Sequence, residues 1–140
     1  MRYWDASALV PLILRQGRSA DMERLLEADA ELVTWWGTAV ECYSALMRLV
    51  REGTLPRTAL PAAENRLHLL RQAWDEILPD DACRRMAERM LRVHPLRAGD
   101  ALQLAAAVVA AEHEPERLPM VCLDARLAAA ARLEGFTVLS

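Results

Sequence analysis

The chain contains no lysine. All 17 basic residues are arginines, and 20 acidic residues bring the formal net charge to −3 at pH 7. This balance argues against a generally basic nucleic-acid-binding surface, although a local group of arginines is still able to hold a phosphate chain. A receiver-type phosphoaspartate switch needs a lysine, and a phosphoaspartate enzyme needs a second Asp two residues after the first, where this chain has Ser7. Both classes are therefore excluded.

Cysteine and histidine are also scarce, with three of each. Cys42, Cys83 and Cys122 are odd in number and show no C-x-x-C spacing, so we expect reduced thiols in the core of a cytoplasmic protein rather than disulfides or a zinc site. The histidines show neither H-E-x-x-H nor any paired spacing. A zinc hydrolase or a two-histidine ribonuclease is therefore not expected.

Several common motifs and all long apolar runs are missing. The sequence lacks G-x-x-x-x-G-K-[ST], G-x-G-x-x-G and G-x-S-x-G, which excludes the usual nucleotide and acyl-transfer sites. The most apolar stretch, Ala101–Ala111, contains Gln103 and is shorter than the roughly 18 residues of a membrane span. Tyr3 and Trp4 begin regular structure almost at once, so we expect no leader peptide and no membrane association.

What the chain has in quantity is small apolar side chains. Of its 140 residues 54% are hydrophobic and only 5% are aromatic. Ala and Leu fill closely packed helices. A chain of this length buries roughly two thirds of the surface that its unfolded form exposes, so no second domain is needed. We expect one domain over residues 1–140 with a helix-dominated interior.

Short apolar segments alternate with helical patterns along the chain. We predict strands at 2–4, 32–35, 74–78, 120–123 and 136–139. We predict helices at about 7–16, from 19 or 21, from 38 to Gly53, at 58–73, from Asp80 to His94, at 98–113 and at 125–134. Strands separated by helices of this length pair in parallel with right-handed crossovers. The pattern therefore predicts an α/β fold with a parallel sheet.

Four carboxylates stand where a strand ends or a helix begins, each inside an apolar segment: Asp5, Glu41, Asp100 and Asp124. Ligands of open α/β sheets bind outside the carboxyl ends of the strands, and carboxylates gathered there repel one another unless a cation lies between them. Oxygen ligands without His or Cys suit Mg²⁺ or Mn²⁺. Such an ion activates water and neutralises developing charge at a phosphodiester, so no side-chain base is required.

Taken singly, three of these acids have a structural alternative. Glu41 completes an S/T-x-x-E capping box with Thr38, Asp100 favours a helix N-terminus through the helix dipole, and Asp124 N-caps the last helix. Asp5 is harder to explain in this way, because it follows an apolar strand directly and Ser7 is able to cap the first helix by itself. The alternatives stay open for each acid alone, and the joint occurrence favours a shared site.

The segments around the four acids resemble the four acidic motifs of PIN-domain ribonucleases, in order and spacing, and the VapC toxin group most of all. These segments are Trp4–Val10, Ala39–Leu46, Ala98–Ala107 and Leu123–Ala131. The resemblance implies a PIN-like three-layer α/β/α fold with a central, flavodoxin-like parallel sheet of four to five strands. It further implies a Mg²⁺-dependent endoribonuclease toxin of a VapBC-type system, a homodimer, and a cognate VapB-type antitoxin that occupies the site.

Residue by residue, Asp5, Glu41, Asp100 and Asp124 match the family's catalytic, metal-binding acids. We expect Asp5 and Asp100 to bind Mg²⁺ or Mn²⁺ directly, and Glu41 and Asp124 to act directly or through water. Retention of all four acids favours an RNA-cleaving enzyme over a catalytically idle module of the same fold that binds RNA or a protein partner.

Four further residues bear on this site. Ser7 matches the family's small hydroxyl residue, whereas Cys122 stands where many relatives carry Thr or Ser, which puts a supporting hydrogen bond in doubt. Arg97 and Arg126 lie next to two of the acids and are candidates for phosphate contact, with solvent exposure as the alternative for each. The RNA target, the cleavage site, the number of metal ions and the antitoxin are not encoded in any motif.

Overall fold

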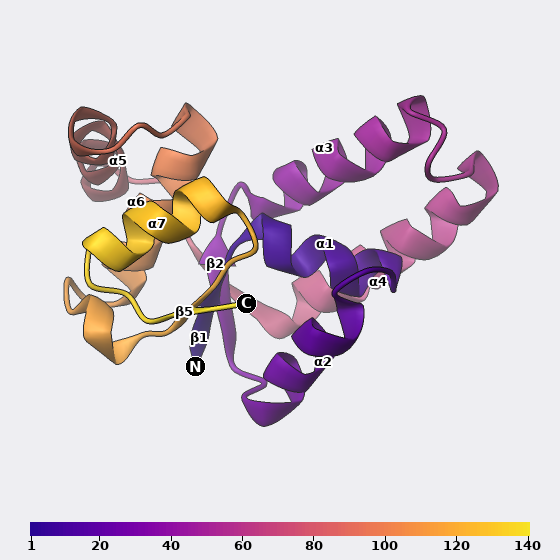
Figure 1. The fold of residues 1–140 in the computed structure, drawn as a ribbon, viewed down its shortest axis with the longest axis horizontal. Coiled ribbons are helices and arrows are strands. Elements are labelled where there is room, and N and C mark those ends of the chain that lie inside the picture. The colour runs from indigo at the N-terminus through magenta and orange to yellow at the C-terminus, as the bar shows by residue number, and fades with distance from the viewer.

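A parallel sheet of five strands runs through the molecule, as the computed structural model of residues 1–140 shows (Figure 1). The strands are β1 (Arg2–Trp4), β2 (Leu32–Trp35), β3 (Trp74–Ile77), β4 (Met120–Val121) and β5 (Val138–Leu139). Their order across the sheet is β3-β2-β1-β4-β5, and every neighbouring pair is parallel. The predicted parallel sheet of four to five strands is confirmed, with β4 and β5 shorter than predicted.

Seven α-helices and two short 3₁₀ turns connect the strands. The helices are α1 (Ala6–Leu14), α2 (Ser19–Ala28), α3 (Thr38–Arg51), α4 (Leu60–Ala73), α5 (Asp81–Val93), α6 (Ala98–Ala110) and α7 (Ala125–Leu133). The 3₁₀ turns η1 (Arg57–Ala59) and η2 (Pro115–Arg117) lie before α4 and before β4. None of the helices is long and apolar enough to cross a membrane.

Side chains of the strands alternate between the two faces of the sheet, because successive residues of a strand point to opposite sides. Tyr3 and Met120 pack with α5, α6 and α7, whereas Trp4 and Val121 pack with helices α1 to α4. In Figure 1 the hairpin of α3 and α4 extends to one side and α5, α6 and α7 cover the other. The predicted three-layer α/β/α arrangement is therefore confirmed.

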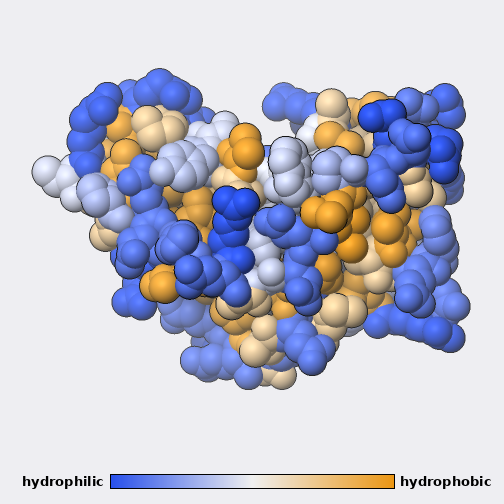
Figure 2. All heavy atoms as spheres, turned by 180° about the vertical axis from the view of Figure 1, so that it is seen from behind, coloured by the Kyte–Doolittle hydropathy of each residue, from blue (hydrophilic) through white to orange (hydrophobic).

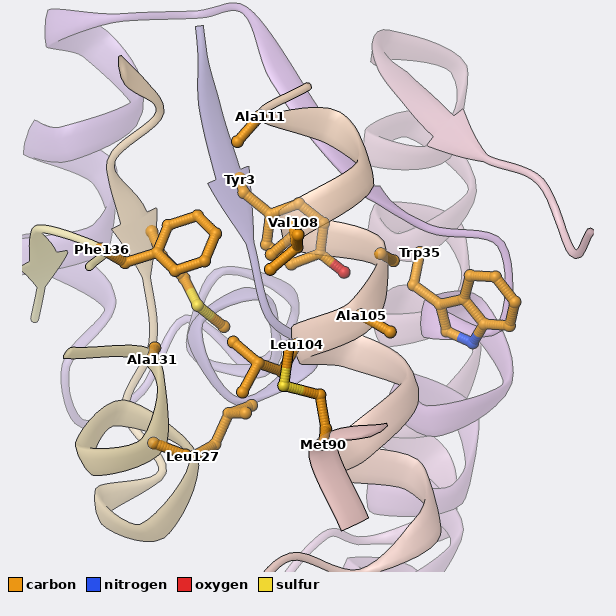
Figure 3. Close-up of a cluster of buried hydrophobic side chains, with 14 of the residues drawn as sticks. Tyr3, Trp35, Met90, Leu104, Ala105, Val108, Ala111, Leu127, Ala131 and Phe136 are labelled. Atoms are coloured by element: carbon orange, nitrogen blue, oxygen red, sulfur yellow. The ribbon is translucent and has the colours of Figure 1, made fainter. Parts of the chain in front are cut away.

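The core beneath α6 depends on small side chains (Figure 3). Val108 of α6 lies next to Tyr3 in this core, which also contains Ala105, and the Tyr3 hydroxyl points toward α6. Alanines let α6 approach the sheet closely, so the first turn of α6 is held near the carboxyl ends of the strands. The alanine-rich composition of α6 therefore helps to set the position of Asp100, which lies in that first turn.

Helix starts differ from the sequence prediction in two places. Asp5, not Ser7, is the N-cap of α1, and its side chain accepts a hydrogen bond from the Ser7 amide. The capping box of Thr38 and Glu41 does not form, because Gly37 is the N-cap of α3 and makes no side-chain cap. Thr38 is fully buried and its hydroxyl bonds Thr34 instead. The local sequence pattern favoured these caps, but in the folded chain the Ser7 and Thr38 hydroxyls form hydrogen bonds with residues of other elements.

Other boundaries moved by a few residues. Helix α1 ends at Leu14 and not near Gln16, because Arg15 adopts a left-handed conformation with φ of 53° and its amide bonds the Pro11 carbonyl. The predicted helix from Thr58 begins with the 3₁₀ turn η1. The predicted caps Asp80 and Asp124 are confirmed, since each accepts a hydrogen bond from a backbone amide three residues on.

Candidate active site

The carboxyl ends of β2, β1 and β4 face a notch between the two halves of the molecule, which is open at the top of Figure 2. Asp5 follows β1 directly, and Asp124 caps α7 just after the neighbouring strand β4. Glu41 lies in the first turn of α3, which follows β2. Asp100 lies in the first turn of α6. All four predicted residues thus stand at the starts of helices.

Asp5 is a buried carboxylate, with 4% of its surface exposed. Its Oδ2 accepts hydrogen bonds from the Ser7 amide at 2.9 Å, from the Ser7 hydroxyl, and from the Cys122 thiol at 3.7 Å. Burial raises the pKa of Asp5, the bonds from Ser7 lower it, and the nearby charge of Asp124 raises it. The carboxylate is held in place at an electrostatic cost.

The Ser7 hydroxyl also joins the two halves of this edge. Its Oγ accepts hydrogen bonds from the amide of Leu123 at 2.9 Å and the amide of Asp124 at 3.1 Å. Asp124 in turn accepts a bond from the Leu127 amide at 2.8 Å. One hydroxyl therefore fixes Asp5 relative to the loop that carries Asp124.

Glu41 is held from the opposite side of the site by a buried amide. Gln103 Nε2 donates to Glu41 Oε1 at 3.1 Å and lies 2.9 Å from Thr38 Oγ1, while Gln103 Oε1 accepts from the Tyr3 hydroxyl at 2.7 Å. Burial raises the pKa of Glu41 to about 7, the bond from Gln103 lowers it, and the charges of Asp5 and Asp100 raise it. The charges of two other carboxylates therefore act on Glu41.

Asp100 is half-buried and makes neither a hydrogen bond nor an ion pair through its side chain. Its charge raises the pKa of Glu41. The charge of Asp124 likewise raises the pKa of Asp5, and the charge of Asp5 raises the pKa of Glu41, so the four acids act on one another's surroundings at this edge of the sheet. We call these four side chains the acidic row.

The family model for the PIN domain matches residues 2–114 of the chain. The chain belongs to the PIN domain family. PIN domains are generally nucleases. The matched segment contains Asp5, Glu41 and Asp100 and ends before Asp124. The first three acids thus lie in the part of the chain that defines the family.

Two solved structures share this PIN fold. PAE2754 from Pyrobaculum aerophilum is 24% identical, with a TM-score of 0.61, and the match covers 93% of this chain and 79% of the other. A chain of a toxin-antitoxin complex from Klebsiella pneumoniae is 14% identical, also with a TM-score of 0.61, and the match covers 100% of this chain and 97% of the other. No curated protein sequence matches this one. At these identities the solved structures establish the fold alone.

The donor set of this PIN domain fits a hard divalent cation, though not a closed protein cage. No three His, Cys, Asp or Glu side chains are arranged to hold an ion among themselves. Several carboxylate oxygens accept no hydrogen bond, namely Glu41 Oε2, Asp124 Oδ2 and both oxygens of Asp100. Mg²⁺ usually keeps several waters and binds through one or two carboxylates, so such spaced oxygens suit it. The assignment of individual ligands stays a prediction.

Cys122 contacts two oxygen atoms of the site through its thiol. Cys122 Sγ contacts Asp5 Oδ2 at 3.7 Å and the Asp124 carbonyl at 3.5 Å. Burial and the charge of Asp5 raise the pKa of this thiol to about 12, so it stays protonated and able to donate. A thiol is a weaker donor than a hydroxyl, and all three cysteines are free and buried.

Arg97 and Arg126 are exposed and make no side-chain hydrogen bond or ion pair, so both side chains are free to contact a phosphate.

The sequence analysis did not identify Gln103 as a residue of the site. The available signal was a single amide in an otherwise apolar helix, because a buried amide needs hydrogen-bond partners. The identity of those partners depends on the packing of α6 on the sheet, which brings Gln103 to Tyr3, Thr38 and Glu41.

Proposed function

We propose that this PIN domain is a Mg²⁺- or Mn²⁺-dependent endoribonuclease and the toxin of a VapBC-type toxin-antitoxin system. The observation that carries the proposal is the acidic row itself: four carboxylates stand at helix starts by the carboxyl edge of the sheet, and one of them, Asp5, is buried, while burial and the charges of neighbouring acids raise the pKa values of Asp5 and Glu41. Repulsion of this kind is relieved by a bound cation. No His, Lys or activated Cys stands among these acids to supply a different chemistry.

In this proposal Asp5 and Asp100 bind the ion directly, and Glu41 and Asp124 act directly or through water. The ion, when bound, lowers the pKa of a water and neutralises charge on the scissile phosphodiester. The protein's own contribution is positioning: Ser7 fixes Asp5, and Gln103 fixes Glu41. Fixed carboxylates need little reorganisation during the reaction.

The toxin assignment draws on the structural neighbour from Klebsiella pneumoniae, which belongs to a toxin-antitoxin complex. An anionic notch is complementary to a cationic side chain, so a neutralising partner is expected to place Arg or Lys among the acids. The same proposal includes a homodimer and a site of action in the cytoplasm. Co-purification from the native host tests for the partner, and retained binding after its basic residues are replaced would count against insertion into the site.

The decisive experiment is cleavage of single-stranded RNA by the purified protein. Mg²⁺ or Mn²⁺ should support cleavage, and excess EDTA should abolish it. Asp100→Asn should be inactive, whereas Asp81→Asn should be fully active, because Asp81 also stands in the first turn of a helix but pairs with Arg84 at an exposed position. Full cleavage in EDTA, or by Asp100→Asn, would exclude the mechanism.

A catalytically idle module that binds RNA or a protein is the second candidate. It predicts RNA binding without cleavage under every metal condition and no growth arrest on expression. The toxin proposal predicts growth arrest with discrete cleavage sites across the transcriptome, and no arrest by Asp100→Asn. The four acids favour the enzyme, because an idle module does not need mutually repelling carboxylates at one edge.

A further inference from the structure

Two members of the acidic row, Glu41 and Asp124, line hollows, and the two hollows differ in size. Beside Glu41 lies a hollow of about 170 Å³ with Arg48 in its wall. Beside Asp124 lies one of about 420 Å³, which we call the α7 hollow. Its wall includes Arg18, Cys122, Asp124, Ala125, Ala128 and Arg132. Small-molecule sites occupy roughly 300–1,000 Å³, so only the α7 hollow has room for a ligand of nucleotide size.

The α7 hollow continues the carboxyl edge of the sheet past the acids. Cys122 lines the hollow and also contacts Asp5, so the hollow and the acidic row share a wall. Ala125, Ala128 and Arg132 follow one another at helical spacing and form one face of α7. The two alanines leave space, and the face ends in a guanidinium.

The hollow has charges of both signs, with the Asp124 carboxylate at the end next to the acids and two arginines, Arg18 and Arg132, elsewhere in its wall together with Ser140. Arg132 is exposed and makes no hydrogen bond or ion pair through its side chain. Arg18, from the segment between α1 and α2, pairs with Asp21 at 2.6 Å at an exposed position. Exposed pairs of this kind contribute little, so Arg18 is able to exchange Asp21 for a phosphate at small cost. Arginine binds phosphate through a bidentate fork.

We infer that the α7 hollow holds the nucleotide next to the scissile phosphodiester, with Arg132 and Arg18 on its distal phosphate. Arg132 lies eight residues after Asp124, which is about 12 Å along the axis of α7. One nucleotide thus fits between the guanidinium at one end and the acidic row at the other. The inference rests on the proposed function, since it takes single-stranded RNA as the substrate.

Arg126, which the sequence favoured because it adjoins Asp124, does not line the hollow. It lies one residue after Ala125 and is therefore turned about 100° away around α7. Arg132 and Arg18 are distant from the acids in sequence and come to the same hollow only in the folded chain. Arg132 and Arg18 are therefore different candidates for phosphate contact from Arg97 and Arg126, which do not line the hollow.

Binding of a fluorescein-labelled single-stranded RNA, measured by anisotropy in EDTA, tests the inference without relying on catalysis. Arg132→Ala should weaken binding about tenfold and reduce the slope of log K against log salt by roughly 0.7, because one phosphate contact is lost. Ala125→Leu should weaken binding without changing the slope, because it fills the exposed wall of the hollow and removes no charge. Arg132→Lys should recover the slope.

Two variants serve as matched controls. Ala129→Leu places the same side chain at an exposed position of α7 that does not line the hollow, and Arg57→Ala removes an exposed arginine in η1 that makes no ion pair. Both should bind RNA as the unmodified protein does. The inference would be overturned if Arg132→Ala and Ala125→Leu bound RNA with the same affinity and the same salt slope as the two controls.

The occupant itself is tested with ¹³C-methyl alanine spectra. Uridine 5′-monophosphate should shift the Ala125 and Ala128 methyls more than inorganic phosphate does at the same concentration, and equal shifts would overturn the nucleotide assignment. The outcomes also separate the two proposals. If the protein cleaves RNA and Arg132→Ala binds RNA as well as the unmodified protein does, the nucleotide site in the α7 hollow is rejected and the nuclease proposal stands. If RNA binding depends on Arg132 but no cleavage occurs under any metal condition, the nuclease proposal is rejected and the binding site stands.

Discussion

The two sides of the acidic row are built differently. On the side of β1 and β4, Asp5 and Asp124 each cap a helix, and Ser7 binds both the Asp5 carboxylate and the Asp124 amide. On the side of β2 and α6, neither Glu41 nor Asp100 caps anything, and Glu41 is held by the distant Gln103.

This difference shows which acids have a structural role of their own. The capping bonds of Asp5 and Asp124 join residues two or three apart, so they form wherever those helices begin. The bond between Gln103 and Glu41 joins residues 62 apart and forms only when the folded chain brings Gln103 to the start of α3. The capping alternative for Glu41 is therefore removed, whereas Asp5 and Asp124 do cap helices, which is compatible with their proposed role in the site.

The largest expected effect is on activity and metal response. Asp5→Asn and Asp100→Asn should abolish RNA cleavage, raise the melting temperature of the metal-free protein, and reduce the stabilisation by Mg²⁺, because each removes a repelling charge and a ligand. Asp5→Ala should in addition lose about 1 kcal/mol of capping, which Asn retains. Thermal melts with EDTA and with Mg²⁺ measure this, and lower metal-free stability in both Asn variants would contradict a shared site.

The next effect concerns the link on the β1 side. Ser7→Ala should destabilise the protein by about 2 kcal/mol, because the amides of Leu123 and Asp124 lose their acceptor and Asp5 loses a donor. Ser44→Ala is the control, since Ser44 is exposed on α3 and makes no side-chain hydrogen bond. Urea unfolding compares the two. If Ser7→Ala lowers the free energy of unfolding no more than Ser44→Ala does, the Ser7 hydroxyl does not stabilise the link between Asp5 after β1 and the loop after β4.

The corresponding link on the β2 side should behave as a network. Gln103→Leu should cost about 1–2 kcal/mol, because the fully buried Tyr3 hydroxyl loses its acceptor. Adding Tyr3→Phe should recover part of this loss, since it removes the unpartnered group. A double-mutant cycle by urea unfolding gives the coupling, and strictly additive losses would argue against the network.

A pH dependence should appear in EDTA on the same side. The pKa of Glu41 rises from 4.5 to about 7 on folding, so the folded state binds the proton more tightly than the unfolded chain. Stability is therefore lost as the pH rises through about 7 and is regained as it falls toward 4.5. The melting temperature should be higher near pH 5.5 than near pH 8, and Glu41→Gln should reduce this difference. An unchanged dependence in Glu41→Gln would refute the assignment.

The smallest effect should come from Cys122→Ser. A hydroxyl is a stronger donor than a thiol, but the sulfur lies 3.7 Å from Asp5 Oδ2 and the shorter oxygen side chain gains little. We expect a change in unfolding free energy below about 1 kcal/mol and nearly unchanged RNA cleavage. A large loss of activity in Cys122→Ser would show that the thiol itself has a role at Asp5.

The alternation of strands and helices was predictable from the sequence because it depends on near neighbours. Strand β1 is read from two aromatic residues before Asp5, and α6 from an alanine-rich pattern after Arg97. Cap assignments were less reliable. Ser7 and Thr38 both fit capping patterns, but their hydroxyls bond groups from other elements, Leu123 and Gln103 respectively. A short polar side chain accepts whichever partner the folded chain brings to it.

By itself the sequence determined the parallel α/β fold and the position of four acids at strand ends and helix starts, because periodicity and local caps act over a few residues. Only the tertiary structure decided that Gln103 holds Glu41, that Ser7 links Asp5 to Asp124, and that Arg18 and Arg132 share a hollow beside the acids. These partners lie tens of residues apart, and their proximity follows from the packing of helices on the sheet, which no local pattern specifies.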